Sequence, residues 1–247
     1  MTGKDNPRHL NIKEYYRDLY RRCGEILELS LESEEIDFNR SHNFLSDLEI
    51  WMRVLSLRPE VTILQAASRE YQFSLLALAL GQYRQAFMAL RLFLELSLTS
   101  VHFSAHELDF RIWEKKNGDI KWNILVDNDN GVFSKQFVEV FCEDLADEAL
   151  HYKTLATKVY RECSEYVHGN SNTHDSLPEK LQFISNVHYA WLDKAKSVRQ
   201  VVSFALSARY LMTLDNVGKN NLEHIVCDEL GHLEFIRLFF GNDTEEK

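Results

Sequence analysis

Two long apolar segments that meet at a single glycine constrain the fold more than any other feature of this chain. Residues 59–80 and 82–102 each carry about three to four large apolar side chains per two helical turns, and Gly81 separates them. This spacing predicts two helices, and one glycine between them predicts an antiparallel hairpin with a very tight corner. Because residues 82–102 are apolar nearly all round, we expect the second helix to lie at the centre of the core.

The composition favours helices throughout. The 247 residues include only three prolines and nine glycines, too few for a β-rich chain with many turns. We find no internal repeat and no strand-like alternation of apolar and polar residues. We therefore predict an all-α, single-domain helical bundle. It divides into an N-terminal helical extension (residues 1–58), a core (59–217) and a C-terminal helix with an acidic tail (218–247).

Apolar spacing and capping residues predict the other elements. The helices expected besides the hairpin are residues 11–32, 41–57, 107–116, 135–142, 148–168, 179–215 and 222–240. Between them we expect a loop at residues 32–40 and an irregular segment, packed by its aromatic side chains, over 113–134. Ser134 is the expected N-cap of the helix that follows. The polar stretch 169–178 is a predicted loop of the kind that often carries functional residues.

Net charge and targeting signals narrow the classes of function. The formal net charge of −10 argues against broad non-specific binding of nucleic acid, although it leaves room for a small nucleic-acid site. The first 18 residues have no apolar stretch typical of a secretory signal, and apolar runs such as 73–80 are too short to span a bilayer. The four cysteines show no CxxC spacing and predict reduced thiols. We expect a cytoplasmic protein that does not associate with membranes.

The predicted helix over residues 148–168 holds the strongest candidate site. Gly169 and Asn170 follow it directly as a stop signal. Arg161 and His168 are seven residues apart, so they differ by about 20° around the helix and share one face. The apolar stripe expected to face the core consists of Leu150, Leu155, Val159 and Tyr160. A guanidinium and an imidazole are therefore expected together at the solvent end of this helix.

An arginine and a histidine in this arrangement suit cleavage of RNA without a metal. The reaction needs removal of the proton from a 2′-hydroxyl, and an imidazole, which titrates near neutral pH, can accept it. A guanidinium stabilises the negative charge that grows on the phosphorane oxygens. The product would be a 2′,3′-cyclic phosphate. Since one helix supplies one histidine, the acid for the leaving 5′-oxygen must come from a second protomer or from water, which is a physical reason for a homodimer.

Five further residues are candidates for supporting this pair. Glu165 lies one turn before the histidine and would fix its tautomer, or it is a solvated surface acid. Ser164 and Asn170 would hold and orient a phosphate, or they are simply structural. Arg91 and Glu95 are four residues apart in the central helix. They form an ion pair on a partly covered face, or they support the arginine and histidine from behind.

Three segments together resemble the HEPN superfamily of prokaryotic helical domains, over about residues 60–210. They are LGQYRQAFMALRLFLE (80–95), the tryptophan-containing segment after it, and YRECSEYVHGN (160–170). The mark shared by that superfamily is an arginine followed after four to six residues by a histidine near a helix end, which corresponds here to Arg161 and His168. The resemblance implies a homodimeric, metal-independent endoribonuclease without cofactors, of toxin or anti-phage defence type, with these two residues catalytic.

A catalytically silent protein of the same fold is the alternative. In active members the position after the arginine is often a small polar residue, whereas this chain has Glu162. That acid and the net negative charge favour a HEPN-like module that serves as a dimerising or regulatory subunit. Its partner would be a protein of a defence or toxin–antitoxin system.

A metal-binding helical protein is a third, weaker option. His224, Asp228 and His232 follow one another at intervals of four residues, as do His102 and His106, and such spacing can place ligands on one helix face. Neither set has the HExxH pattern or a cysteine at ligand spacing, so we expect no metal site. The chain also lacks the glycine-rich phosphate-binding motifs and the nucleophile elbow, which leaves nucleotide-binding folds and α/β-hydrolases without support.

Overall fold

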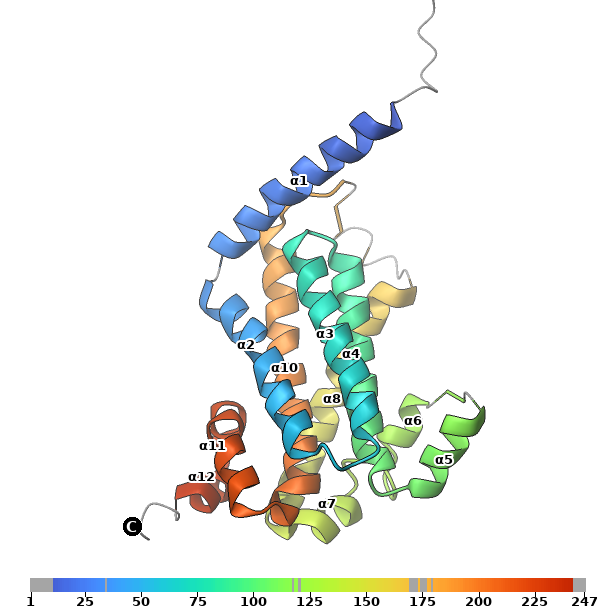
Figure 1. Ribbon diagram of the computed structural model, residues 1–247, viewed down its shortest axis with the longest axis vertical. Helices are drawn as coiled ribbons and strands as arrows, with labels where there is room; N and C mark the ends of the chain where they lie inside the picture. The colour runs from blue at the N-terminus through green and yellow to red at the C-terminus, as the bar shows by residue number, and fades with distance from the viewer. Residues whose placement is uncertain are drawn as a thin grey trace, which may run out of the picture.

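A computed structural model describes residues 11–33, 35–116, 118–119, 121–168, 173, 177–178 and 180–241. Over these residues the chain forms helices and no strand, which confirms the all-α prediction, and the helices assemble into one elongated bundle (Figure 1). The α-helices are α1 (Ile12–Glu32), α2 (Glu35–Val54), α3 (Val61–Ala79), α4 (Tyr83–Phe103), α5 (Glu107–Lys116), α6 (Trp122–Leu125), α7 (Lys135–Cys142), α8 (Ala149–His168), α10 (Ser185–Tyr210), α11 (Asn216–Leu230) and α12 (Glu234–Gly241). Two 3-10 helices cover Glu143–Glu148 and Leu211–Thr213.

The hairpin of α3 and α4 forms as predicted, with a corner that only glycine suits. Gly81 has φ +70°, and a Cβ added there would lie 3.1 Å from both the Gln182 carbonyl oxygen and Cγ2 of Ile26. A larger residue would therefore be strained and crowded at once. Beyond the corner, Ser74 Oγ of α3 donates to the Ala86 carbonyl of α4 at 2.6 Å, which joins the two helices inside the core.

Helix α4 is the centre of the core. Helices α3, α8 and α10 all pack against it, and its buried side chains include Phe87, Leu90, Phe93 and Leu94. α4 is also long and apolar enough to cross a membrane by length and composition, with 67% of its most apolar window buried in the bundle. The central helix of a bundle meets the same criteria, so this finding is weak evidence for a membrane span.

The boundaries of α2 and α10 differ from the prediction. Helix α2 begins at Glu35, so the loop predicted over residues 32–40 is wrong there. The reason is Phe38, which is buried and lies beside the ring of His188 of α10, so that this acidic stretch has one apolar anchor. Helix α10 covers Ser185–Tyr210 rather than residues 179–215.

The C-terminal helix also differs from the prediction, because it is two helices. Asp215 caps α11 by accepting a hydrogen bond from the Gly218 amide at 2.8 Å, so the stretch read as a helix end begins a helix. Gly231 ends α11, and α12 begins three residues later. The expected division between residues 217 and 218 therefore falls inside α11.

The segment between α5 and α7 is packed by its aromatic side chains, as expected. The Trp122 ring stacks on Tyr160 of α8 with ring centroids 3.8 Å apart, and Phe133 lies against Phe204 of α10. Ser134 caps α7 by accepting from the Phe137 amide at 3.1 Å, which confirms the predicted cap. These contacts hold the segment against the bundle. The irregular structure predicted over residues 113–134 is wrong at 113–116, which belong to α5, and at 122–125, which form α6.

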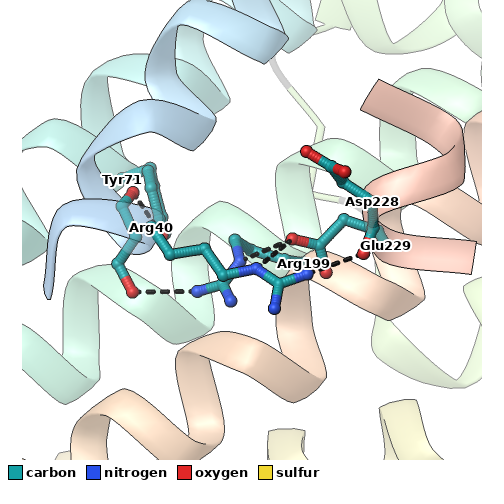
Figure 2. Close-up of polar contacts among 6 residues, drawn as sticks. Arg40, Tyr71, Arg199, Asp228 and Glu229 are labelled. Atoms are coloured by element: carbon teal, nitrogen blue, oxygen red, sulfur yellow. Dashed lines mark hydrogen bonds and ion pairs between the residues drawn. The ribbon is translucent and has the colours of Figure 1, made fainter. Parts of the chain in front are cut away.

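A buried polar network, which the sequence did not predict, joins α2, α3, α10 and α11. Arg199 Nε donates to Glu229 Oε1 at 3.0 Å, and Arg199 Nη1 donates to Ser41 Oγ at 2.8 Å. Arg40 Nε lies 3.7 Å from the same carboxylate oxygen, so two guanidinium groups reach one acid (Figure 2). Tyr71 completes the network by donating to the Ser41 carbonyl at 3.0 Å, and burial raises the pKa of its hydroxyl to about 12.

Candidate functional site

The row of α8 residues that faces the core differs from the row predicted from the sequence. The buried side chains are Ala149, Tyr152, Ala156, Val159 and Cys163. Of the predicted stripe only Val159 is buried, whereas Leu155 and Tyr160 are half-buried and Leu150 is 73% exposed. Helices α4 and α10 pack against this row. Leu155 and Tyr160 flank it, whereas Leu150 lies on the opposite side of α8, the side that carries Arg161.

Arg161 and His168 both lie on the exposed side of α8, opposite its buried row. The helix is continuous from one to the other, so they lie within about 20° of each other around the axis and roughly 10 Å apart along it. Among the described residues neither side chain forms a hydrogen bond or an ion pair. Both groups are therefore available to a ligand or to another chain.

A shallow hollow of about 600 Å³ runs along the same side of α8. Its lining consists of Asn128, Leu150, Lys153, Thr154, Thr157, Lys158, Arg161, Glu162 and Glu165. Lys153, Lys158 and Arg161 bring three positive charges together on a protein whose net charge is −10. His168 lies beyond the end of the hollow, at the last residue of the helix.

The acids and the serine next to the pair have defined positions. Glu162 Oε2 lies 3.0 Å from Nζ of Lys194 in α10, so its charge is compensated within the bundle. Glu165 lines the hollow beside Arg161. Ser164 Oγ donates to the Tyr160 carbonyl of its own helix at 2.7 Å, which agrees with the structural alternative for this residue. Asn170 lies outside the described residues.

Arg91 and Glu95 form the predicted ion pair, with 3.4 Å between Nη2 and Oε1. Both also contact Tyr160 of α8: the guanidinium donates to the phenol oxygen and lies 4.5 Å from the ring centroid, and the phenol donates to Glu95 Oε1 at 3.1 Å. Burial raises the pKa of that phenol. The pair thus supports α8 through the residue that precedes Arg161, without touching Arg161 itself.

Two residues of α4 hold the last turn of α8, and the sequence did not point to either. Arg84 Nη1 donates to the Tyr166 carbonyl at 2.8 Å, so it satisfies one of the carbonyl groups that a helix end leaves without a partner. Phe87 stacks on the Tyr166 ring with centroids 3.9 Å apart and planes 13° apart. Their spacing of three residues on α4 was a possible signal. These contacts fix the turn that carries His168.

The described residues contain no group of three His, Cys, Asp or Glu side chains placed to hold a metal ion. His232 follows Gly231, where α11 ends, and its ring contacts the Tyr152 hydroxyl at 3.2 Å, so the residue lies outside the helix that carries His224 and Asp228. The His102 ring stacks on His106, and burial lowers the pKa of His102 to about 4. The third option of the sequence analysis therefore has no assembled site in the part of the chain that the structure describes.

Comparison of the chain with protein-family models, with curated proteins and with solved structures finds no match. The function must therefore be argued from the residues of α8 and their surroundings.

Proposed function

We propose that this protein is a metal-independent endoribonuclease of the HEPN type, acting in a toxin or anti-phage system, with Arg161 and His168 in its active site. The observation that carries the proposal is the exposed side of α8. It presents a guanidinium and an imidazole on one face of a helix end that Arg84 and Phe87 hold in place. Neither group has a partner within the described residues, so both are free to bind a phosphodiester.

The separation of the two groups favours an active site built from two protomers. Seven residues correspond to roughly 10 Å along a helix, and side chains of one helix lean in the same direction, toward its N-terminus. Both groups must come within about 3 Å of one phosphodiester to act on it together. Arg161 of one protomer and His168 of a second protomer can meet this requirement, whereas the two groups of one helix stay apart.

In this arrangement each group has one task. The imidazole accepts the proton of a 2′-hydroxyl, and the 2′-oxygen attacks the adjacent phosphorus. The guanidinium stabilises the charge on the phosphorane oxygens. The bond between phosphorus and the 5′-oxygen then breaks, the 5′-oxygen takes a proton, and the products are a 2′,3′-cyclic phosphate and a 5′-hydroxyl. Lys153 and Lys158, next to Arg161, would contact flanking phosphates.

The test compares purified wild type, Arg161→Ala and His168→Ala on single-stranded RNA in the presence of a chelator. We expect the wild type to leave 2′,3′-cyclic phosphate ends and each variant to be about 10²- to 10⁴-fold slower. His151→Ala and Arg69→Ala are matched controls, because both are exposed helix residues outside the hollow. Equal rates for the wild type and the two site variants would refute the proposal.

A non-catalytic HEPN-like subunit is the second candidate, and the acids beside the pair favour it. Glu165 shares the lining of the hollow with Arg161 and weakens its attraction for phosphate. Glu162, although paired with Lys194, stands where active members of the superfamily often have a small polar residue. On this alternative the wild type, Arg161→Ala and His168→Ala are equally inert toward RNA, equally folded and equally tolerated when expressed in bacteria. Growth arrest by the wild type alone would favour the nuclease.

A further inference from the structure

Helix α1 is amphipathic, but the bundle covers only part of its apolar side. Apolar or small residues recur at alternating steps of four and three: Ile12, Tyr16, Leu19, Cys23, Ile26 and Ser30. Ile26 and Ser30 are buried, whereas Ile12 is 72% exposed and Tyr16 is 63% exposed. Figure 1 shows α1 crossing one end of the bundle, with its first turns extending beyond it.

The uncovered half of α1 is unlike an ordinary solvent-exposed helix. Besides Ile12 and Tyr16 it exposes Tyr15 and, at 82%, Tyr20. A helical segment as short as this uncovered half is only marginally stable by itself in water, because helices in proteins owe most of their stability to the packing of an apolar face. A contiguous exposed apolar patch usually marks an interaction surface.

An open apolar groove of about 460 Å³ lies beside the covered half of α1. Helices α1, α2 and α3 form it, with the lining Leu27, Leu31, Phe38, His42, Leu45, Gln72, Phe73, Leu75, Leu76 and Ala79. Phe73 and Leu76 are both more than half exposed at its edge. Because Tyr20, Leu27 and Leu31 are seven and four residues apart, they lie on one side of α1. The groove therefore continues the uncovered apolar surface of the first half of the helix.

The charges of α1 are self-complementary in the antiparallel sense. Residues 11–22 contain four basic and two acidic side chains, whereas residues 23–33 contain three acidic side chains and no basic one. Two copies of α1 that run in opposite directions would place each basic half beside an acidic half. Like charges would instead meet in a parallel pair.

We infer that α1 is a dimerisation element that takes a second copy of this chain. The two helices pair antiparallel about a two-fold axis near Gly24, and the first half of each α1 lies in the groove of the other protomer. Gly24 is exposed, and a Cβ there would have nothing within 4 Å, so the two backbones can approach closely at the axis. A two-fold interface of this kind uses the same surface twice and closes on itself, so it ends at a dimer.

This interface would also join the ends of the bundles at which α8 finishes. Ile26 of α1 contacts the corner at Gly81, and Arg84 and Phe87, which follow that corner, hold Tyr166 at the end of α8. The inference itself stands without the proposed nuclease activity, because it rests on the apolar surface and charges of α1 and on the groove beside it.

The first experiment measures the mass in solution by light scattering and sedimentation at micromolar concentrations. We expect a dimer for the wild type and a monomer with unchanged helix content for Tyr16→Glu/Tyr20→Glu. Since both tyrosines are exposed, these substitutions leave the protomer intact. Leu108→Glu, on α5 and 72% exposed, is the matched control and stays dimeric. A monomeric wild type, or a tyrosine variant that remains dimeric, overturns the inference. If the wild type is a monomer and the variant loses only RNA binding, α1 contacts RNA instead.

A charge swap tests the antiparallel arrangement separately. Lys13→Glu/Arg17→Glu puts acids on both halves and should raise the Kd of the dimer at least about tenfold. Adding Glu28→Lys/Glu32→Lys should bring the Kd back, and no recovery would contradict antiparallel pairing. A dimer that fails to cleave RNA upholds this inference and rejects only the nuclease, whereas cleavage by a stable monomer rejects only the dimer.

Discussion

Arg199 and Arg161 are the same residue type in opposite situations. Arg199 is 2% exposed and is bound by Glu229 and Ser41 in the centre of the bundle (Figure 2). Arg161 is exposed on α8 and has no partner among the described residues. A buried charge is tolerated only when it is paired, and Arg199 has its partners within the bundle. An exposed charge needs no partner, and this is why Arg161, rather than Arg199, is a candidate for binding a ligand.

The largest expected effect is on stability, at the buried network. Glu229→Ala leaves Arg199 buried without its carboxylate and should lower the free energy of unfolding by about 3–5 kcal/mol. Urea denaturation measures this change as a lower midpoint with an unchanged slope. Glu223→Ala, exposed on the same helix, is the control and should change stability by less than about 0.5 kcal/mol. Equal effects of the two substitutions would show that the buried pair of Arg199 and Glu229 matters no more for stability than an exposed acid.

A buried group without a partner should make stability depend on pH. His188 is buried, neither ring nitrogen has a hydrogen-bond partner among the described residues, and burial lowers its pKa to about 4. Between an ordinary histidine pKa of about 6.5 and pH 4, the unfolded chain binds a proton that the folded chain does not. The free energy of unfolding therefore falls as the pH is lowered through this range, by about 3 kcal/mol for this group. In His188→Phe this contribution to the dependence of unfolding free energy on pH should disappear. If the wild type and the variant lost stability in parallel between about pH 6.5 and pH 4, His188 would not be the buried titrating group.

The half-buried network at Tyr160 is intermediate in burial between Arg199 and Arg161. Tyr160→Phe removes the hydrogen bonds to Arg91 and Glu95 but keeps the ring against Trp122, so we expect a loss of about 1 kcal/mol. The same variant should retain RNA cleavage within a few-fold, because Tyr160 supports α8 and does not touch substrate. A loss of cleavage as large as that of His168→Ala would show that this network takes part in the active site.

The smallest expected effect is at the exposed pair itself. Arg161→Ala and His168→Ala should each change the free energy of unfolding by less than about 0.5 kcal/mol, because neither side chain has a partner to lose among the described residues. Thermal or urea unfolding checks this result. Destabilisation by 2 kcal/mol or more, on the order of a lost core side chain, would show that the residues serve the fold.

The sequence predicted the parts of the fold that depend on local chemistry. The corner at Gly81, the cap at Ser134 and the central position of α4 follow from backbone freedom, capping and an apolar surface on all sides. The helix break at Gly231 and the early start of α2 were missed. Gly231 is a local signal for a helix end that was overlooked. The early start of α2 depends instead on tertiary packing, through the contact between Phe38 and His188.

The candidate site shows the same division. The shared face of Arg161 and His168 follows from helix geometry, and the structure places both on the exposed side of α8. The lysines of the hollow, the contacts of Arg84 and Phe87 at the helix end, and the Arg199 network were not predicted. The lysines lie on the same helix as Arg161, so their spacing was a local signal that was missed. The contacts of Arg84 and Phe87 with Tyr166, and the Arg199 network, join residues far apart in the chain, so the sequence does not show which residues meet.

The most direct test of the active site mixes the two inactive variants. If Arg161 of one protomer works with His168 of the other, a heterodimer of Arg161→Ala and His168→Ala contains one intact site. Equal amounts of the two, allowed to exchange subunits, should then recover about a quarter of the wild-type rate of RNA cleavage, since half of the dimers are mixed and each has one working site of two. A mixture no more active than its components, although mixed dimers form, would contradict an active site shared between protomers.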